Sequence, residues 1–134
     1  MFRILVVEDD DKLNRLFCTV LARNGYETLS AFEGQEALAL LEKEYIDLII
    51  SDIMMPQMDG YELISLLRQA GYSMPILIIT AKESFEDKQR GFLAGSDDYM
   101  VKPIDVGEMV LRVGALLRRA KLVSARKLSC GSTI

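Results

Sequence analysis

Five polar residues stand at the ends of short strand-like runs, and their side chains suit the handling of a phosphoryl group. They are Glu8, Asp9, Asp52, Thr80 and Lys102. The runs that precede the acids and the threonine are continuous and apolar, as in strands buried on both faces of a parallel sheet. Such sheets bind ligands at the carboxyl ends of their strands, so we expect these side chains to meet at one edge. The sequence therefore predicts a pocket with three acids, a hydroxyl and an amine.

The three acids indicate a metal ion in this pocket. Clustered carboxylates repel one another, and one of them would take up a proton unless a cation were present. A set of oxygen ligands suits a hard ion, Mg²⁺ above all, and the chain has no histidine to favour a transition metal. Asp9 and Asp52 are the natural direct ligands, and Glu8 is expected to reach the ion through water.

The same set of groups fits phosphoryl transfer. A carboxylate can attack phosphorus and form an aspartyl phosphate. The reaction then depends mostly on positioning and on neutralising the equatorial oxygens of the phosphoryl group. Mg²⁺ can hold one oxygen, Lys102 a second and the Thr80 hydroxyl a third. Every polar group of the pocket therefore has a task.

Each of these residues alone also has an ordinary explanation. An isolated acid at a strand end commonly caps a helix or faces solvent, and Asp10 or Asp11 can serve only as the cap of the next helix. Thr80 alone would be a strand threonine, and Lys102 alone a surface lysine. The functional interpretation rests on the shared sheet edge of the whole set.

Strand and helix signals alternate along the chain, and the expected strands place the five polar residues at their ends. The strands are expected at 4–7, 28–31, 48–50, 76–79 and 98–101. Apolar residues at helical spacing mark helices within 13–21, 37–41, 63–67, 84–93 and 109–117. Helix starts are indicated by Asp59 with Glu62, Ser84 with Asp87, and Asp105 with Glu108. Such alternation favours an α/β fold, with a parallel sheet covered by helices on both faces.

Length and composition set limits on the class of protein. The chain has 134 residues, about the length of one domain. Its net charge of −4 does not suggest that this segment alone binds nucleic acid. No apolar run approaches the ~20 residues that span a bilayer, and the first residues lack the features of a signal peptide. Cys18 and Cys130 cannot form a disulfide framework. We therefore expect a cytoplasmic protein without a membrane partner.

Four segments of the chain resemble response-regulator receiver domains of bacterial two-component systems. They are ILVVEDD (4–10), DIMMPQMDG (52–60), ITA (79–81) and DDYMVKP (97–103). The resemblance covers about residues 2–121, and the four segments occur in the family's order. It implies a flavodoxin-like, doubly wound, five-stranded parallel sheet in the order 2-1-3-4-5, with five helices.

The resemblance assigns the roles of the acids. Asp52 matches the phosphoacceptor of the family. Glu8 and Asp9 match the acidic pair that holds Mg²⁺, and Asp52 itself completes the carboxylate ligands. Met54 matches the residue whose backbone carbonyl joins the metal, so its side chain matters little for ligation.

The resemblance also implies a conformational switch. Thr80 matches the hydroxyl that turns toward the phosphoryl group, and Lys102 matches the lysine that contacts it. The bond from Lys102 to Pro103 matches one that is usually cis in the family. Tyr99 matches the aromatic switch residue, which is expected to move inward as Thr80 moves.

A dimer face is implied on the fourth helix, fifth strand and fifth helix. Its residues are Lys88, Phe92, Asp97, Asp98, Glu108, Val110, Arg112 and Arg119. The expected pairs across the dimer are Lys88–Glu108, Asp98–Arg112 and Asp97–Arg119, around an apolar centre of Phe92 and Val110. Gly114 and Leu93 replace charged residues that are common in the family. The alternative is an ordinary solvated surface of mixed charge.

The resemblance divides the chain into two parts. Residues 1–121 are expected to form the receiver domain, with the last helix ending near Lys121 or Leu122. Residues 122–134 are expected to be a linker or the start of a C-terminal winged-helix output domain that is missing here. A sensor histidine kinase would then phosphorylate Asp52, the receiver would dimerise, and the missing domain alone would bind DNA and regulate transcription. A stand-alone receiver is the alternative.

Two other classes are weighed beside this one. Phosphohydrolases with an aspartate nucleophile use a similar set, but they usually carry a second acid two residues later. Met54 stands there, so we expect no enzymatic turnover of a substrate. Interaction modules that work without phosphate typically lose one of the acids, the threonine or the lysine, and this chain has all of them.

Overall fold

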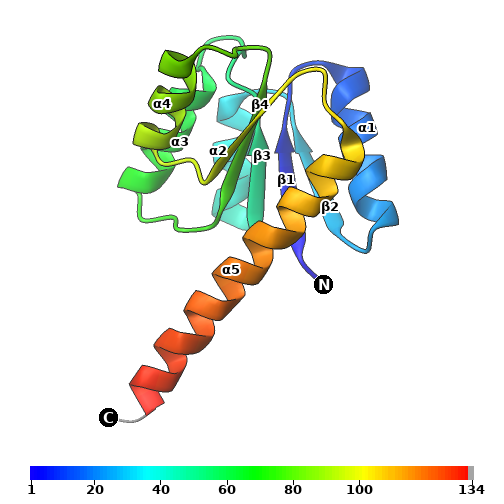
Figure 1. The fold of residues 1–134 in the computed structure, drawn as a ribbon. Coiled ribbons are helices and arrows are strands. Elements are labelled where there is room, and N and C mark those ends of the chain that lie inside the picture. Colours follow the sequence, from blue (N-terminus) through cyan, green and yellow to red (C-terminus); the bar gives the residue numbers. More distant parts are fainter. Residues whose placement is uncertain (133–134) are drawn as a thin grey trace.

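Strands and helices alternate five times in the structure, a computed structural model that describes the backbone of residues 1–132 and the side chains of residues 1–121 (Figure 1). The strands are β1 (Arg3–Val7), β2 (Glu27–Ala31), β3 (Leu48–Ser51), β4 (Ile76–Thr80) and β5 (Asp98–Val101). The helices are α1 (Asp11–Arg23), α2 (Gly34–Lys43), α3 (Gly60–Gln69), α4 (Phe85–Ala94) and α5 (Val106–Ser132). Each expected strand and helix is present.

The five strands form one parallel sheet in the order β2-β1-β3-β4-β5. This order confirms the expected flavodoxin-like, doubly wound topology. Nearly every residue of the three central strands is buried, because helices cover both faces of the sheet. The edge strands β2 and β5 are more polar and partly exposed.

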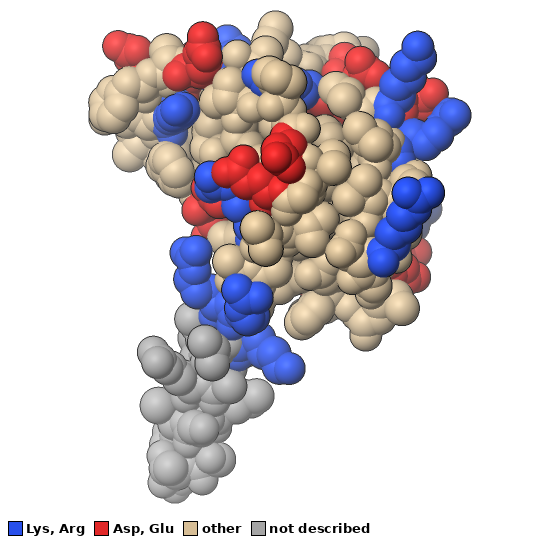
Figure 2. All heavy atoms as spheres, turned by 45° about the vertical axis from the view of Figure 1, so that its right-hand side comes forward, with Lys and Arg blue, Asp and Glu red and all other residues tan. Residues whose placement is uncertain are grey.

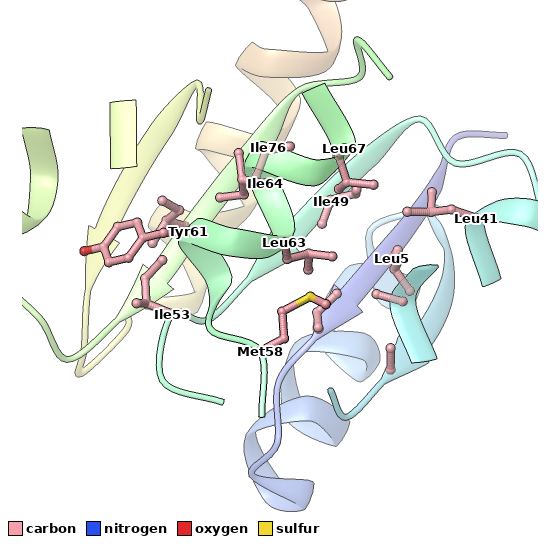
Figure 3. Packing of buried hydrophobic residues seen from close by; sticks show 14 of the residues in the cluster. Leu5, Leu41, Ile49, Ile53, Met58, Tyr61, Leu63, Ile64, Leu67 and Ile76 are labelled. Atoms are coloured by element: carbon pink, nitrogen blue, oxygen red, sulfur yellow. The ribbon is translucent and has the colours of Figure 1, made fainter. Parts of the chain in front are cut away.

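Alternate residues of each strand feed two separate apolar layers. Leu5 and Val7 of β1 face the layer that contains residues of α2 and α3, while Ile4 and Val6 face the layer with residues of α1 and α5. In the first layer α3 lays its apolar stripe on the sheet (Figure 3). This stripe consists of Leu63, Ile64 and Leu67, all fully buried.

The helix starts that the sequence indicated are capped as expected. The Asp59 carboxylate accepts a hydrogen bond from Glu62 N at 2.9 Å. The Ser84 hydroxyl accepts from Asp87 N, and the Asp105 carboxylate accepts from Glu108 N, both at 3.1 Å. Asp10 caps α1 in the same way, by accepting from Leu13 N. These caps satisfy amide groups that a helix leaves unpaired in its first turn.

Helix α5 continues to Ser132, so the expectation that it ends near Lys121 is wrong. The apolar spacing on which that expectation rests reports contact with the core, and Leu117 is the last buried residue among the α5 side chains described, which reach Lys121. Beyond that point the segment carries five basic residues, has no proline and has no glycine before Gly131, which favours continuation of the helix. The division into residues 1–121 and 122–134 stays a prediction, and Thr133 and Ile134 lie outside the described residues.

Basic side chains gather on α5 where it leaves the body of the domain (Figure 2). Arg118, Arg119 and Lys121 are exposed there, although the whole chain carries a net charge of −4. Among the described residues, no helix has both the length and the apolar character that crossing a membrane requires.

Candidate functional site

The strand-end residues meet at one edge of the sheet, as the sequence predicted. Lys102, just after β5, places its Nζ 2.7 Å from Glu8 Oε1 and 2.7 Å from Asp52 Oδ2. Carboxylate oxygens of Glu8, Asp9 and Asp52 all lie within 4.8 Å of one another. The structure thus brings together groups that are separated by up to 94 positions in the chain.

Asp52 is held firmly by the backbone around it. Its N–H donates to the Val7 carbonyl at 3.0 Å, which continues the pairing of β3 with β1. Its Oδ1 accepts hydrogen bonds from Ile53 N at 2.6 Å and Met54 N at 3.2 Å. The residue is only 4% exposed. One carboxylate oxygen is therefore fixed by amide groups, while Oδ2 faces Lys102.

The loop after Asp52 is packed closely against the first turn of α3. Gly60 N donates to the Ile53 carbonyl at 2.9 Å. A Cβ at Gly60 would collide with the carbonyl oxygen of Asp52 and would lie 2.9 Å from Ile53 Cα. The glycine is required here by close approach of two backbone segments.

The acidic cluster fits a hard divalent cation. Glu8 is 2% exposed, and burial raises the pKa of its carboxyl to about 7, although hydrogen bonds from Lys102 and Asp10 N oppose the shift. The nearby charge of Asp52 raises the pKa of Glu8 further. A cation between these groups would relieve the cost of holding several negative charges together. The ligands are all oxygen, as Mg²⁺ prefers, and the Met54 backbone lies beside Asp52.

Lys102 neutralises two carboxylates at once. Burial alone would lower the pKa of its ammonium group, but hydrogen bonds with Asp52 and Glu8 outweigh this effect, and the pKa is raised. The side chain is therefore charged at neutral pH and points at Oδ2 of Asp52. An ammonium group at this place can contact a phosphoryl oxygen attached to Asp52.

Thr80 and Tyr99, the two residues of the expected switch, both lie against the loop between β4 and α4. Thr80 is fully buried at the end of β4, and its hydroxyl lies 3.5 Å from Lys82 N in the following loop. The Tyr99 hydroxyl donates to the Lys82 carbonyl at 2.8 Å, and its side chain is already buried. Both residues thus contact the β4–α4 loop. The Lys102–Pro103 bond is cis, as the resemblance implied.

Tyr61 also belongs to the surroundings of the site, although nothing in the sequence indicated it. Its hydroxyl donates to the Asp87 carbonyl in the first turn of α4 at 3.0 Å, and the Arg90 guanidinium lies 4.3 Å from its ring centroid. Tyr61, Lys82 and Arg90 line a cavity of about 350 Å³ together with Ile53 and Met54. In the sequence, Tyr61 fits the apolar spacing of α3, and this spacing cannot show that its hydroxyl has a partner on α4.

Four of the six charged residues of the expected dimer face already have partners within the chain. Arg112 contacts both oxygens of Asp98 at 2.9 Å, and Glu108 at 3.0 Å. Asp97 accepts from Arg68 at 3.0 Å, a pairing that the sequence analysis missed. Lys88 and Arg119 form no ion pair with another described residue. Phe92 is half exposed and Val110 partly buried, so an apolar centre is available on this surface.

Comparison with known families identifies the class of this domain. Residues 4–114 match the response regulator receiver domain. This match covers most of the chain, and the chain belongs to that family: it is the receiver domain of a two-component response regulator.

Its curated relatives are regulators. The "Transcriptional regulatory protein PcoR" of Escherichia coli is 43% identical over 125 residues, which are 93% of this chain and 55% of the relative. The "Heme response regulator HssR" of Staphylococcus epidermidis is 38% identical over 134 residues, 100% of this chain and 59% of the relative. The chain thus spans less than two thirds of the length of these relatives.

Solved receiver structures have the same fold. A Francisella response regulator receiver domain superposes with a TM-score of 0.86 at 38% identity, over 90% of this chain and 99% of that one. A response regulator from Chloroflexus aurantiacus superposes with a TM-score of 0.82 at 38% identity, over 87% of this chain and 98% of that one.

Proposed function

We propose that Asp52 accepts a phosphoryl group from a sensor histidine kinase. An oxygen of the Asp52 carboxylate forms the new bond to phosphorus, and the bond from phosphorus to the imidazole nitrogen of the kinase breaks. The freed nitrogen keeps the electron pair of that bond and takes a proton from solvent. The observation that carries the proposal is the ammonium group of Lys102, which lies 2.7 Å from both Asp52 and Glu8.

Glu8, Asp9 and Asp52 would hold Mg²⁺ with the backbone carbonyl of Met54. Bound there, the ion would neutralise charge on the phosphoryl oxygens and orient the group for in-line attack. Lys102 stabilises a second oxygen, and the Thr80 hydroxyl donates to a third. Oδ1 of Asp52 stays fixed by two backbone amides, so Oδ2, which faces the Lys102 ammonium group, is the oxygen that would react.

The phosphoryl group would then shift an equilibrium between two states of the domain. Thr80 and Tyr99 contact the same loop before α4, so a turn of Thr80 toward the phosphoryl group would alter the support of that loop. The surface of α4, β5 and α5 would favour a homodimer in the phosphorylated state. We propose that a C-terminal DNA-binding domain turns this dimerisation into regulation of transcription, since PcoR is named as a transcriptional regulatory protein.

The central test is phosphorylation by a small phosphodonor such as phosphoramidate, followed by intact-protein mass spectrometry. We expect wild type with Mg²⁺ to gain the mass of one phosphoryl group, and Asp52→Asn to gain none. Asp11→Asn, which changes an exposed acid of α1, is the matched control and should behave as wild type. Removal of Mg²⁺ with EDTA should abolish the gain. A modified Asp52→Asn variant would contradict the proposal.

We further propose that the domain acts on no substrate other than its own phosphoryl group. Met54 occupies the position of the second acid of aspartate-nucleophile phosphohydrolases, and a thioether cannot protonate a leaving group. The expected result is no release of phosphate from p-nitrophenyl phosphate beyond one equivalent of protein. Sustained turnover that Asp52→Asn abolishes would favour the phosphohydrolase class instead.

A further inference from the structure

Asn14 of α1 is buried directly beneath the acidic pair and bonds to the ends of two strands. It is 1% exposed. Its Nδ2 donates to the Glu8 carbonyl at 3.0 Å and to the Ala31 carbonyl at 3.1 Å. These carbonyls stand where the pairing of β1 with β2 ends. The Ala31 carbonyl also accepts from Glu8 N at 3.0 Å, and Asn14 Nδ2 is its second donor. The asparagine side chain thus completes the hydrogen bonding of this sheet corner.

The orientation of the Asn14 amide is fixed by chemistry. Both carbonyl partners can only accept, so the Nδ2 end must face them. The other end, Oδ1, accepts from the Ser30 hydroxyl on β2 at 2.8 Å. Cys18 lies one turn further along α1, with its Sγ 3.5 Å from Oδ1. All hydrogen-bonding groups of the buried amide therefore have partners.

The Glu8 carbonyl belongs to the peptide unit that joins Glu8 to Asp9. The Glu8 side chain has its own restraints, since it bonds with Lys102 and with Asp10 N. The Asp9 side chain is exposed and makes no hydrogen bond to another described residue. Its direction is therefore set by its backbone, and Asn14 holds the preceding peptide plane.

We propose that Asn14 is a positioning residue for the metal site, acting through the peptide between Glu8 and Asp9. This inference rests on the proposed function, because it concerns the affinity of the acidic pair for Mg²⁺. Loss of the amide would let that peptide rotate, and Asp9 would be less often directed at the ion. Groups that orient metal ligands commonly account for about tenfold or more in metal affinity.

The test uses Mn²⁺ as the probe, because the EPR signal of the free ion gives the bound fraction directly. Asn14→Leu keeps the size of the side chain and removes its amide. We expect its Kd for Mn²⁺ to rise about tenfold over wild type, measured where circular dichroism shows both to be folded. Its phosphorylation by phosphoramidate should need more metal for half-saturation but approach the wild-type rate in excess metal.

The control is Leu21→Ala, which destabilises the same helix through a fully buried apolar residue. Loss of stability alone would act alike in both variants, so Leu21→Ala should keep the wild-type Kd while folded. A Kd in Asn14→Leu equal to that of wild type would overturn the inference. A wild type that binds no Mn²⁺ would overturn the proposed function and this inference with it.

Two milder variants keep the test decisive if Asn14→Leu does not fold. In Asn14→Ala, water can enter and bond with the two carbonyls, but nothing fixes the peptide, so a weaker Mn²⁺ affinity is again expected. Ser30→Ala removes the hydroxyl that donates to Oδ1, together with its contact to Cys18 Sγ, at an exposed position, and should weaken binding less. Unchanged affinity in both alanine variants would overturn the inference.

Discussion

Lys102 is the residue on which the chemistry of the pocket depends most directly. Its ammonium group bonds with both Asp52 and Glu8. Without it, a metal ion would be the cation left to neutralise these carboxylates. Lys102→Met keeps the length of the side chain but removes the ammonium group. We expect phosphorylation by phosphoramidate to slow by about 10²–10³-fold, the loss typical of one transition-state donor. Rates are measured by quenched mass spectrometry at saturating Mg²⁺.

Lys43→Met on the exposed side of α2 is the matched control for this change and should react at the wild-type rate. A Lys102→Met rate within threefold of wild type would show that the metal alone neutralises the phosphoryl oxygens.

Gly60 gives a second prediction for a single residue. A Cβ there would collide with the Asp52 carbonyl, and both backbone segments belong to the site. Gly60→Ala should therefore lower the free energy of unfolding by about 1–3 kcal/mol, as overpacking does. Urea denaturation measures the change.

Gly114→Ala in α5 serves as the control, because the Cβ added there would have room and would not collide with backbone. Its Cβ would meet nothing closer than Arg118 at 3.5 Å, so the better helix propensity of alanine should raise stability by about 0.5–1 kcal/mol. Equal effects of the two substitutions would argue against close packing at Gly60.

The strand-end residues could be predicted from sequence because one geometric rule brings the ends of parallel strands together. Asn14, Tyr61 and Arg68 could not be predicted in the same way. Their partners are backbone carbonyls of other elements, and such partners leave no residue type in the sequence to reveal them. Tyr61 also satisfies the apolar spacing of its helix, which hides the role of its hydroxyl.

At the scale of the elements, Arg68 joins four segments at the edge of the sheet opposite the site. Its guanidinium donates to the carbonyls of Tyr72, Met74 and Gly95, at distances between 2.8 and 3.0 Å. It also pairs with Asp97, which in turn accepts from Ile76 N at 2.9 Å. One side chain therefore fixes the ends of α3 and α4 against the starts of β4 and β5.

Replacement of Arg68 by lysine should destabilise the domain although the charge is kept. An ammonium group cannot reach these carbonyls from one position, because it lacks the planar fork of the guanidinium. Arg68→Lys should cost about 1.5–3 kcal/mol, the range for hydrogen bonds to a charged group. Arg15→Lys, at an exposed i,i+4 pair of α1, should cost no more than about 0.5 kcal/mol. Thermal and urea denaturation of the two variants would separate these outcomes.

The length of α5 shows the limit of sequence reasoning at this scale. The expected end near Lys121 was inferred from the loss of apolar spacing, which marks where a helix stops touching the core. Helix continuation depends on the backbone propensity of each residue and on a stop signal, and none is present before Gly131. The start of the same helix was predicted correctly because Asp105 provides a local cap.

For the whole molecule, the intrachain ion pairs change what a dimer on α4, β5 and α5 would require. Asp98 and Arg112 already satisfy each other, so their pairing across a dimer would gain little. Asp97 is likewise bound to Arg68. Lys88 and Arg119 form no ion pair with another described residue, so their pairing across a dimer would add most. The expected partner of Lys88 is Glu108, which also pairs with Arg112 within the chain.

Charge reversal at these two positions tests the proposed dimer. A twofold dimer contains each pair twice, so Lys88→Glu would replace two attractions by two repulsions. Exposed pairs contribute about 0.2–1 kcal/mol each, so the dimer Kd of the beryllofluoride-activated protein should rise about tenfold.

The double variant Lys88→Glu with Glu108→Lys restores opposite charges, and its dimer Kd should return to within about threefold of wild type. Lys43→Glu makes the same change in net charge on α2 and should have no effect. Sedimentation velocity gives each Kd. A Lys88→Glu variant with the wild-type Kd would place the dimer on another surface, and a double variant as weak as the single one would contradict the pairing of Lys88 with Glu108.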